Sequence, residues 1–134
     1  MPLKKLYLQL NDPVALIGLS RSGVSYAIFQ HIVSSSPLTT LEWSGILHLT
    51  SRTLQRYKKE KRTFEQPYSE RILEIAQLQK RGIEVFGDLE RYNKWLESDI
   101  VALGGVKPKT LLDNSFGIDL LGKELTRIEY GVLA

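Results

Sequence analysis

Apolar residues recur along most of this chain at the spacing of an α-helix. Intervals of three and four residues are clearest in two aliphatic groups, Val24, Ile28 and Ile32, and Ile118, Leu121, Leu125 and Ile128. Residues at these intervals share one face of a helix, which they bury against a core. The pattern therefore predicts an all-α protein, a bundle of several helices. The exception is 6–10, Leu-Tyr-Leu-Gln-Leu, whose period of two is typical of a strand.

Capping residues and helix breakers set the limits of the expected helices. Asp12-Pro13 starts the first, with proline at an early helical position, and a serine run before Pro37 follows a helix over 23–34. A longer helix over 69–85 is expected to stop at Gly87 and to bury Ile72, Ile75, Ala76, Ile83 and Phe86. Asp88 caps the next helix, 98–107 is a loop, Pro108 starts a short helix, and the last runs over 117–130.

Residues 39–62 have the pattern of two short helices joined by a tight turn. Thr39, with Glu42 three residues later, is a capping box, and Thr50-Ser51 is a good start for the second helix. His48 occupies the turn where glycine is usual, so we expect either a positive φ at this histidine or another turn geometry. Two helices joined in this way, the second one basic, form a helix-turn-helix.

The second of these helices carries a concentration of positive charge. From Arg52 to Arg62, six bases stand against one acid, a net charge of +5. In the major groove Arg and Gln can bind base edges, while Lys neutralises phosphates. The predicted DNA-binding residues are Thr50, Ser51, Arg52, Thr53, Gln55, Arg56, Lys58, Lys59 and Lys61. Arg52, Gln55 and Arg56 are expected toward the bases and the lysines nearer phosphates. The alternative is a pair of core helices with a solvated basic face and no role in DNA binding.

Composition narrows the class of protein. The 134 residues include no cysteine, which excludes disulfides, thiolate catalysis and cysteine-ligated zinc. His31 and His48 lie on different expected elements without a carboxylate at ligand spacing, so we expect no metal site, no cofactor and no catalytic residues. Without a long apolar run or a signal-peptide pattern, we expect a cytoplasmic protein with no membrane contact. Residues 1–83 have a net charge of +6 and residues 84–134 one of −3, which indicates different partners for the two parts.

One segment comes close to a phosphate-binding loop. Residues 117–124, Gly-Ile-Asp-Leu-Leu-Gly-Lys-Glu, fit the G-x-x-x-x-G-K part of that motif. Glu124 stands where a Ser or Thr must reach magnesium, and the segment also fits the last amphipathic helix. A nucleotide-binding enzyme built on this segment is therefore a minor alternative.

Four blocks of sequence, taken in order, resemble one family of bacterial proteins. They are 18–22 (Gly-Leu-Ser-Arg-Ser), 51–56 (Ser-Arg-Thr-Leu-Gln-Arg), Phe86-Gly87-Asp88 with Trp95-Leu96, and the C-terminal stretches 103–108, 111–117 and 125–131. Over 18–134 the chain resembles antitoxins with an Xre-like helix-turn-helix and an Xre/MbcA/ParS toxin-binding domain. It departs from the family at 98–100, where Pro-Asn is common, and its first ten residues have no clear counterpart.

The resemblance implies an antitoxin that carries no catalysis of its own. Such antitoxins sit beside a RES-type toxin that consumes NAD, or a related ADP-ribosyltransferase-like toxin. The C-terminal domain would cover the toxin's active site, and the helix-turn-helix would bind operator DNA. Residues 1–66 are accordingly expected to serve dimerisation and DNA binding, and residues 67–134 toxin binding.

The end of the chain is the expected toxin-binding site. The apolar seam of the last helix stops at Ile128, which leaves Arg127, Glu129, Tyr130, Gly131, Val132, Leu133 and Ala134 for another surface. Gly131 is expected to end the helix, so that a terminal carboxylate could substitute for a phosphate of NAD. The alternative is a frayed tail.

A homodimer is expected, because one short helix contacts too few base pairs for specificity. Its seam is predicted within 6–32, where apolar residues exceed the needs of a local core. The other function that these features allow is a dimeric helix-turn-helix repressor without a toxin partner.

Overall fold

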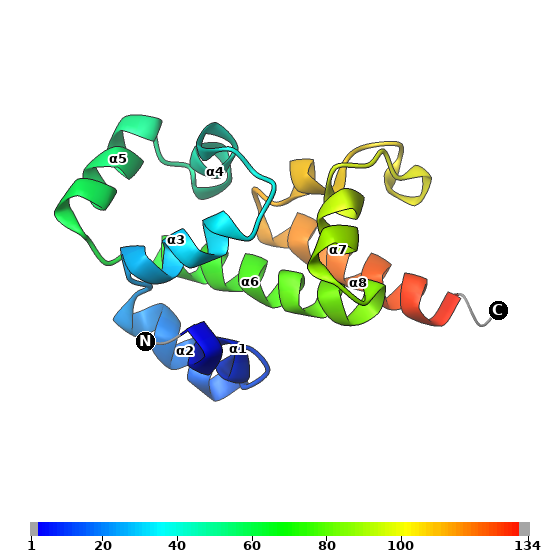
Figure 1. Cartoon of the computed structure of the whole chain (residues 1–134), viewed down its shortest axis with the longest axis horizontal. Coiled ribbons are helices and arrows are strands. Elements are labelled where there is room, and N and C mark those ends of the chain that lie inside the picture. The colour runs from blue at the N-terminus through cyan, green and yellow to red at the C-terminus, as the bar shows by residue number, and fades with distance from the viewer. Residues whose placement is uncertain (1–2, 132–134) are drawn as a thin grey trace. The chain divides into compact units, whose positions relative to one another are not determined.

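Helices form the folded elements of residues 3–131, the part of the chain that the computed structural model describes (Figure 1). The α-helices are α1 (Leu3–Gln9), α2 (Pro13–Ser22), α3 (Tyr26–Ser34), α4 (Thr40–Leu47), α5 (Ser51–Glu60), α6 (Gln66–Phe86), α7 (Leu89–Leu96) and α8 (Ser115–Gly131). Two 3₁₀ turns, η1 (Val101–Leu103) and η2 (Pro108–Leu111), precede α8. Over 3–131, β-structure is limited to isolated bridges between Ser25 and Thr63 and between Ile100 and Val106. The predicted all-α fold is confirmed.

The chain divides into two compact units. The first unit ends at Gln77 and the second begins at Leu78, so the division falls within α6. The first unit holds α1 to α5 and the start of α6, and the second holds the end of α6 with α7, η1, η2 and α8. Over 3–131, none of these helices is long and apolar enough to cross a membrane.

Residues 3–9 form the helix α1, so the strand predicted for 6–10 is wrong. Leu6 and Leu10 stand four residues apart and are 1% and 0% exposed, whereas Leu8 is 74% exposed. The buried residues thus follow the helical period, and Leu8, which faces away from the core, creates the apparent alternation. Asp12 caps α2 as predicted, because its carboxylate accepts the N–H groups of Val14 (3.0 Å) and Ala15 (3.3 Å).

Aromatic rings form the centre of the first unit. Phe29 of α3 packs edge-to-face against Trp43 of α4, with 5.3 Å between ring centroids, and against Phe64, at 4.9 Å. Tyr57 of α5 lies 5.1 Å from the same Phe64 ring. Phe64 just precedes α6 and is 1% exposed. One buried ring therefore holds α3 and α5 against the start of α6.

A buried hydroxyl fixes the connection into α3. The Ser69 hydroxyl donates to the carbonyl of Phe64 (2.9 Å) and accepts the N–H of Val24 (2.9 Å). Ser25 caps α3, which begins at Tyr26 rather than at residue 23 as predicted, because Gly23 has a φ of +94°. A side chain at Gly23 would overlap Thr63 and the Phe64 carbonyl, so this turn requires glycine.

Helix α6 begins earlier than predicted and ends at Phe86, where Gly87 with a φ of +97° stops it as expected. Of the expected stripe, Ile72, Ile75 and Ala76 are buried. Ile83 and Phe86 are half-buried instead. The predicted stripe is thus correct in its first half, whereas in its second half the prediction overestimates burial.

Close backbone contacts define the second unit. A side chain at Gly82 of α6 would overlap the ring of Tyr92 on α7, and one at Gly117 of α8 would overlap the Leu111 carbonyl. Leu121 and Leu125 of α8 are both 0% exposed, as the spacing predicted. The loop expected over 98–107 contains the short turn η1. The segment 117–124 lies wholly in α8, where helical bonding occupies the backbone N–H groups that a phosphate would need.

Candidate functional site

The turn between α4 and α5 has the geometry that the sequence predicted. Thr39 and Glu42 form the capping box, with Thr39 N–H to Glu42 Oε1 at 3.0 Å and Glu42 N–H to Thr39 Oγ1 at 3.1 Å. His48 adopts the left-handed conformation, with a φ of 58° and a ψ of 36°. Thr50 caps α5 by accepting the Thr53 N–H at 3.1 Å. Only residues 48–50 separate the two helices, so α5 starts directly after α4.

The core fixes both helices of this motif. Leu54 and Tyr57 of α5 are 2% and 4% exposed and form its inner face. Ser44 of α4 is buried, and the N–H of Leu49 donates to its carbonyl at 3.0 Å. Arg71 of α6 donates to the carbonyl of Ile46 at the end of α4, at 3.3 Å. The inner face of the basic helix therefore packs against the core of the first unit, and its opposite face is exposed to solvent.

The predicted DNA-binding residues, on α5 and at its two caps, fall into two groups by exposure. Seven are exposed, namely Thr50, Arg52, Gln55, Arg56, Lys58, Lys59 and Lys61, while Ser51 and Thr53 are half-buried. Arg52, Arg56 and Lys59 follow one another at intervals of four and three residues, so they share the face opposite Leu54 and Tyr57. We call these three residues the outer stripe. It presents three cations side by side to any surface that α5 approaches.

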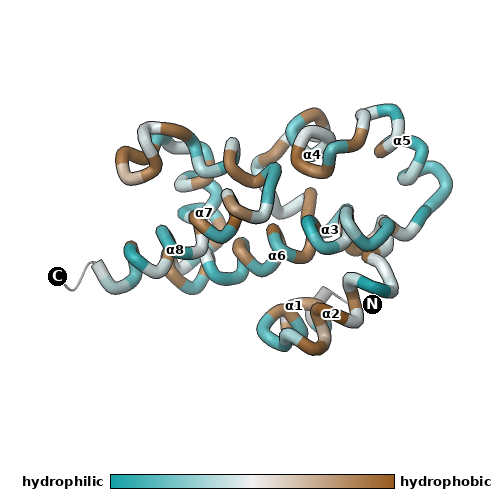
Figure 2. Tube along the Cα trace, turned by 180° about the vertical axis from the view of Figure 1, so that it is seen from behind, coloured by the Kyte–Doolittle hydropathy of each residue, from teal (hydrophilic) through white to brown (hydrophobic). Residues whose placement is uncertain are grey.

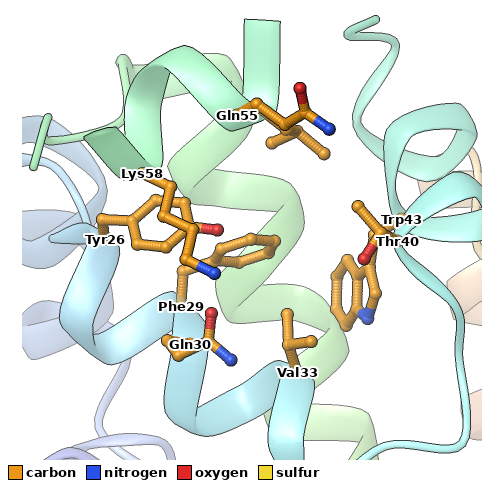
Figure 3. A pocket seen from close by; sticks show the side chains of 9 residues that line it. Tyr26, Phe29, Gln30, Val33, Thr40, Trp43, Gln55 and Lys58 are labelled. Carbon is orange, nitrogen blue, oxygen red and sulfur yellow. The ribbon is translucent and has the colours of Figure 1, made fainter. Parts of the chain in front are cut away.

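Gln55 and Lys58 lie on a different flank of α5. Both line a pocket between α3, α4 and α5, together with residues such as Phe29 and Trp43 (Figure 3). This flank is turned toward the other helices of the first unit rather than along the outer stripe. The structure thus separates two residues that the sequence had grouped with Arg52 and Arg56.

Arg62 is a basic residue whose position the sequence pattern did not single out. Its guanidinium lies 4.8 Å from the centroid of the Tyr57 ring, a cation–π contact. The pKa of the Tyr57 hydroxyl is raised, first by burial and then by Glu65. Lys61, before it, ends α5 with a φ of 52°. The end of α5 therefore holds one cation on an aromatic ring and another on a left-handed turn.

Two of the predicted toxin-binding residues are held by ion pairs within the second unit. Arg81 of α6 makes a two-pronged contact with Glu129 of α8, with both N–O distances at 2.9 Å. The hydrogen bonds from Arg81 hold the pKa of the Glu129 carboxyl below its usual range, and those same bonds raise the pKa of Arg81. Arg127 contacts Glu124 in the same manner, at 2.6 and 2.9 Å.

Glu124, the partner of Arg127 in that second pair, is a buried carboxylate. Its side chain is 7% exposed, a feature that the sequence pattern did not indicate. A buried carboxylate needs a charged partner, and Arg127 supplies it one helical turn later. Tyr130 is 62% exposed, and Gly131 is the last residue of α8. The predicted toxin-binding residues Val132, Leu133 and Ala134 lie outside the described residues.

Large apolar side chains are also exposed on both units. On the first unit these are Leu8, Val14, Ile17 and Leu41, and on the second Val101, Val106, Phe116, Leu120 and Tyr130. Figure 2 shows the apolar positions of α1 and α2 along the trace. Over 3–131, no group of three or more His, Cys, Asp or Glu residues could hold a metal ion. The exposed features are thus a basic helix, apolar patches and a tethered C-terminal helix.

Two family models match the chain, and their limits agree with the two units. The antitoxin Xre-like helix-turn-helix domain matches residues 15–77, and the antitoxin Xre/MbcA/ParS C-terminal toxin-binding domain matches residues 81–131. The first match contains α4 and α5, and the second contains α7, α8 and the ion pair between Arg81 and Glu129. The predicted helix-turn-helix is thereby confirmed as a domain of this type.

A relative and a solved structure are similar over most of the chain. The chain is 25% identical over 132 residues to the Prs ADP-ribosylating antitoxin of Sphingobium sp. (strain YBL2). This match covers 92% of this chain and 83% of that protein. A chain from the crystal structure of the M. tuberculosis MbcT-MbcA toxin-antitoxin complex superposes with a TM-score of 0.58 at 17% identity. That match covers 79% of this chain and 94% of the other, and at this identity it establishes the fold alone.

Proposed function

Because the chain belongs to the Xre/MbcA/ParS antitoxins, we propose that it neutralises a cognate toxin that consumes NAD and represses its own operon by binding operator DNA. The observation that carries the proposal is the toxin-binding domain match over residues 81–131. We assign dimerisation and DNA binding to residues 1–66 and toxin binding to residues 67–134. The antitoxin acts by binding, with no catalysis of its own, in the cytoplasm where operator and toxin meet.

The toxin is proposed to be of the RES type, or a related ADP-ribosyltransferase-like enzyme. Support comes from the name of the Sphingobium relative, the Prs ADP-ribosylating antitoxin, which we interpret as the antitoxin of a toxin that transfers ADP-ribose. Transfer of ADP-ribose uses NAD, so the toxin's active site must accept a pyrophosphate, and such sites carry positive charge. The acidic balance of residues 84–134, six bases against nine acids, complements a basic cleft of this kind.

The end of α8 is the proposed contact with the toxin's active site, through Arg127, Glu129, Tyr130, Gly131, Val132, Leu133 and Ala134. The Arg81–Glu129 pair supports this assignment, because it anchors the last turns of α8 and so fixes the direction in which the chain leaves the helix. The exposed Tyr130 ring offers an apolar anchor next to that exit. Glu129 and Arg127 contribute mainly by holding the helix end in place.

Deletion of residues 130–134 tests this part of the proposal. We expect the shortened protein to keep its helical content and its operator affinity but to lose protection of cells that express the toxin. The matched control is the double variant Arg52→Ala with Arg56→Ala, which should lose operator binding and still protect. A deletion variant that protects as well as the full chain would place the neutralising contact elsewhere.

Operator binding is proposed to run through α5 and its N-terminus, Thr50, Ser51, Arg52, Thr53, Gln55, Arg56, Lys58, Lys59 and Lys61. Within this set the outer stripe carries the main contacts, since its three cations share the face opposite the buried Leu54. Truncating Arg56 should cost about 1–3 kcal/mol of operator binding and relax base preference, while Lys59→Ala should mainly flatten the salt dependence. Anisotropy titrations at several salt concentrations measure both. Unchanged affinity of the Arg52, Arg56 double variant would refute the assignment.

A homodimer is proposed, with α1 and α2 in its seam. Leu8 of α1 is 74% exposed, and Val14 and Ile17 of α2 are 77% and 50% exposed. Val14 and Ile17 stand three residues apart on one face, and burial of such side chains against a second copy is favourable. Light scattering of the wild type should give a dimer and that of Val14→Lys a monomer. A wild type that is monomeric at micromolar concentration would contradict the seam.

The alternative, a dimeric repressor without a toxin partner, shares the basic helix but gives the second unit no ligand. The family match over 81–131 favours the antitoxin. Co-expression with the product of the neighbouring reading frame distinguishes the two, because only an antitoxin forms a stoichiometric complex that restores growth.

A further inference from the structure

A pocket of about 230 Å³ lies beneath the basic helix, between α3, α4 and α5 of the first unit (Figure 3). Phe29, Trp43 and Leu54 form the apolar part of its lining, and each is only 1–2% exposed. Polar atoms of other lining residues, among them Tyr26 and Thr40, make up the rest. Gln30, Gln55 and Lys58 line it as well and are exposed, so the polar groups stand at the opening. The pocket thus combines a small aromatic floor with a polar mouth.

The chemistry of the mouth favours an anion. Lys58 is the charged residue of the lining, and no carboxylate lines the pocket. Among the described residues, neither Lys58 nor Gln30 nor Gln55 has a side-chain hydrogen bond or ion pair, so their N–H groups are open to a ligand. Figure 3 shows Lys58 and Gln55 on α5 and Gln30 on α3 among the side chains that surround the pocket. A carboxylate at this position would gain a charge-assisted contact.

The size of the pocket limits the rest of the ligand. A cavity of about 150 Å³ is enough for benzene, and drug-sized ligands use about 300 Å³ or more. At about 230 Å³, the space fits one substituted aromatic ring. Edge-to-face contact with the half-buried Tyr26 ring and with the small exposed parts of Phe29 and Trp43 would hold such a ring.

We propose that this pocket binds a small aromatic carboxylate and that the bound ligand weakens operator binding. The second half of the proposal rests on the proposed function. The physical reason is charge: an anion paired with Lys58 cancels a cation on the helix that faces the phosphates. By linkage, operator DNA must weaken binding of the carboxylate by the same factor.

Phenylacetate is a suitable probe, with the neutral phenylacetamide and the cationic phenethylamine as matched compounds of the same shape. The chain contains two tryptophans, so Trp95→Phe leaves Trp43 as a fluorescent reporter in the pocket wall. Titrations without DNA should show saturable quenching by phenylacetate, confirmed by calorimetry on the unmodified chain. The amide should bind more weakly and the amine weakest.

Two neighbouring lysines give a matched pair of variants. Lys58→Met should abolish the preference for the carboxylate, whereas Lys59→Met, on the outer stripe, removes the same charge and should leave phenylacetate binding intact. Val33→Phe should fill the pocket and exclude all three compounds while keeping every charge. Saturating phenylacetate should lower the operator affinity of the wild type several-fold and that of Val33→Phe not at all.

Several outcomes would overturn the proposal. They are failure of phenylacetate to quench Trp43, equal binding of the carboxylate and the amine, retention of carboxylate preference in Lys58→Met, and operator affinity that saturating phenylacetate leaves unchanged. Operator affinity measured without ligand tests the proposed function separately. A chain that binds operator but not phenylacetate refutes this inference alone, and one that binds phenylacetate but not operator refutes the proposed function.

Discussion

The hydroxyl of Tyr92 leads to a prediction about the stability of the second unit. Tyr92 is 1% exposed, and among the described residues its hydroxyl has no hydrogen-bond partner. Its ring lies against the backbone of Gly82 and 5.9 Å from the ring of Trp95, so the side chain is well packed apart from that one polar atom. Replacing Tyr92 with Phe keeps these ring contacts and removes the unpaired group.

Tyr92→Phe should therefore stabilise the protein. Burying a hydroxyl without a partner costs about 1–3 kcal/mol, and the oxygen leaves only a small void when it is removed. We expect the free energy of unfolding to rise by about 1 kcal/mol at neutral pH. Urea denaturation followed by circular dichroism measures it, and Tyr68→Phe, whose ring is only half-buried, is the control with little expected change.

The pH dependence gives a second measurement of the same effect. Burial raises the pKa of Tyr92 well above the value of 10.0 that an unperturbed tyrosine has. The folded state therefore keeps this hydroxyl neutral where the unfolded chain ionises. Its contribution to stability is complete below pH 10 and is lost as the pH rises through the folded pKa, by about 1.4 kcal/mol per pH unit at most.

Tyr92→Phe lacks this group, so its advantage over the wild type should grow above pH 10. If the variant is no more stable than the wild type at neutral pH, the hydroxyl has a partner such as a bound water, and the reasoning fails. If the two proteins lose stability in parallel above pH 10, the hydroxyl already reaches solvent, with the same consequence.

Three further predictions follow from particular contacts. Gly82→Ala places a methyl group into the Tyr92 ring and should destabilise the second unit by about 1–3 kcal/mol in urea denaturation, whereas Gly122→Ala, where there is open space, should not. Ser69→Ala removes the hydroxyl that bridges Val24 and Phe64 and should cost about 1–3 kcal/mol and lower operator affinity; unchanged stability would mean that these backbone groups find other partners. Glu129→Gln breaks the ion pair with Arg81 and should reduce toxin protection but not operator binding. Because Arg81 lowers the pKa of Glu129, the wild type should be more stable than the variant above the unfolded pKa near 4.5 and should lose this extra stability as the pH falls through the folded pKa. Extra stability of the wild type that persists at that low pH in denaturation experiments would contradict this reasoning.

The helix-turn-helix was largely predictable because its signals are local. The capping box of Thr39 and Glu42 depends on residues three positions apart, and the structure contains both of its hydrogen bonds. The positive φ at His48 was one of two geometries left open, and the backbone adopts it. Glycine is usual there because it has no side chain to clash, and histidine tolerates the conformation within a turn that its neighbours impose.

Where prediction failed, the cause lay in contacts between distant residues. The pattern at 6–10 fits a strand or a helix equally well over so few residues, and burial of Leu6 and Leu10 in the core of the first unit decides for the helix. Glu124 has a charged side chain that would normally be expected at the surface, yet it is buried because α8 packs with that side inward. Such outcomes depend on what the rest of the chain places nearby.

The sequence by itself determined the all-α class, most helix limits, the basic helix and the resemblance to antitoxins, because capping, periodicity and charge act over a few residues. Only the tertiary structure decided which exposed residues stand together. It separates Lys58, on the pocket flank of α5, from Lys59 on the outer stripe, although the two are adjacent in the chain. It also joins Arg81 to Glu129 across 48 residues. Periodicity gives the face of one helix, but the partner of that face depends on how helices pack, which no local pattern encodes.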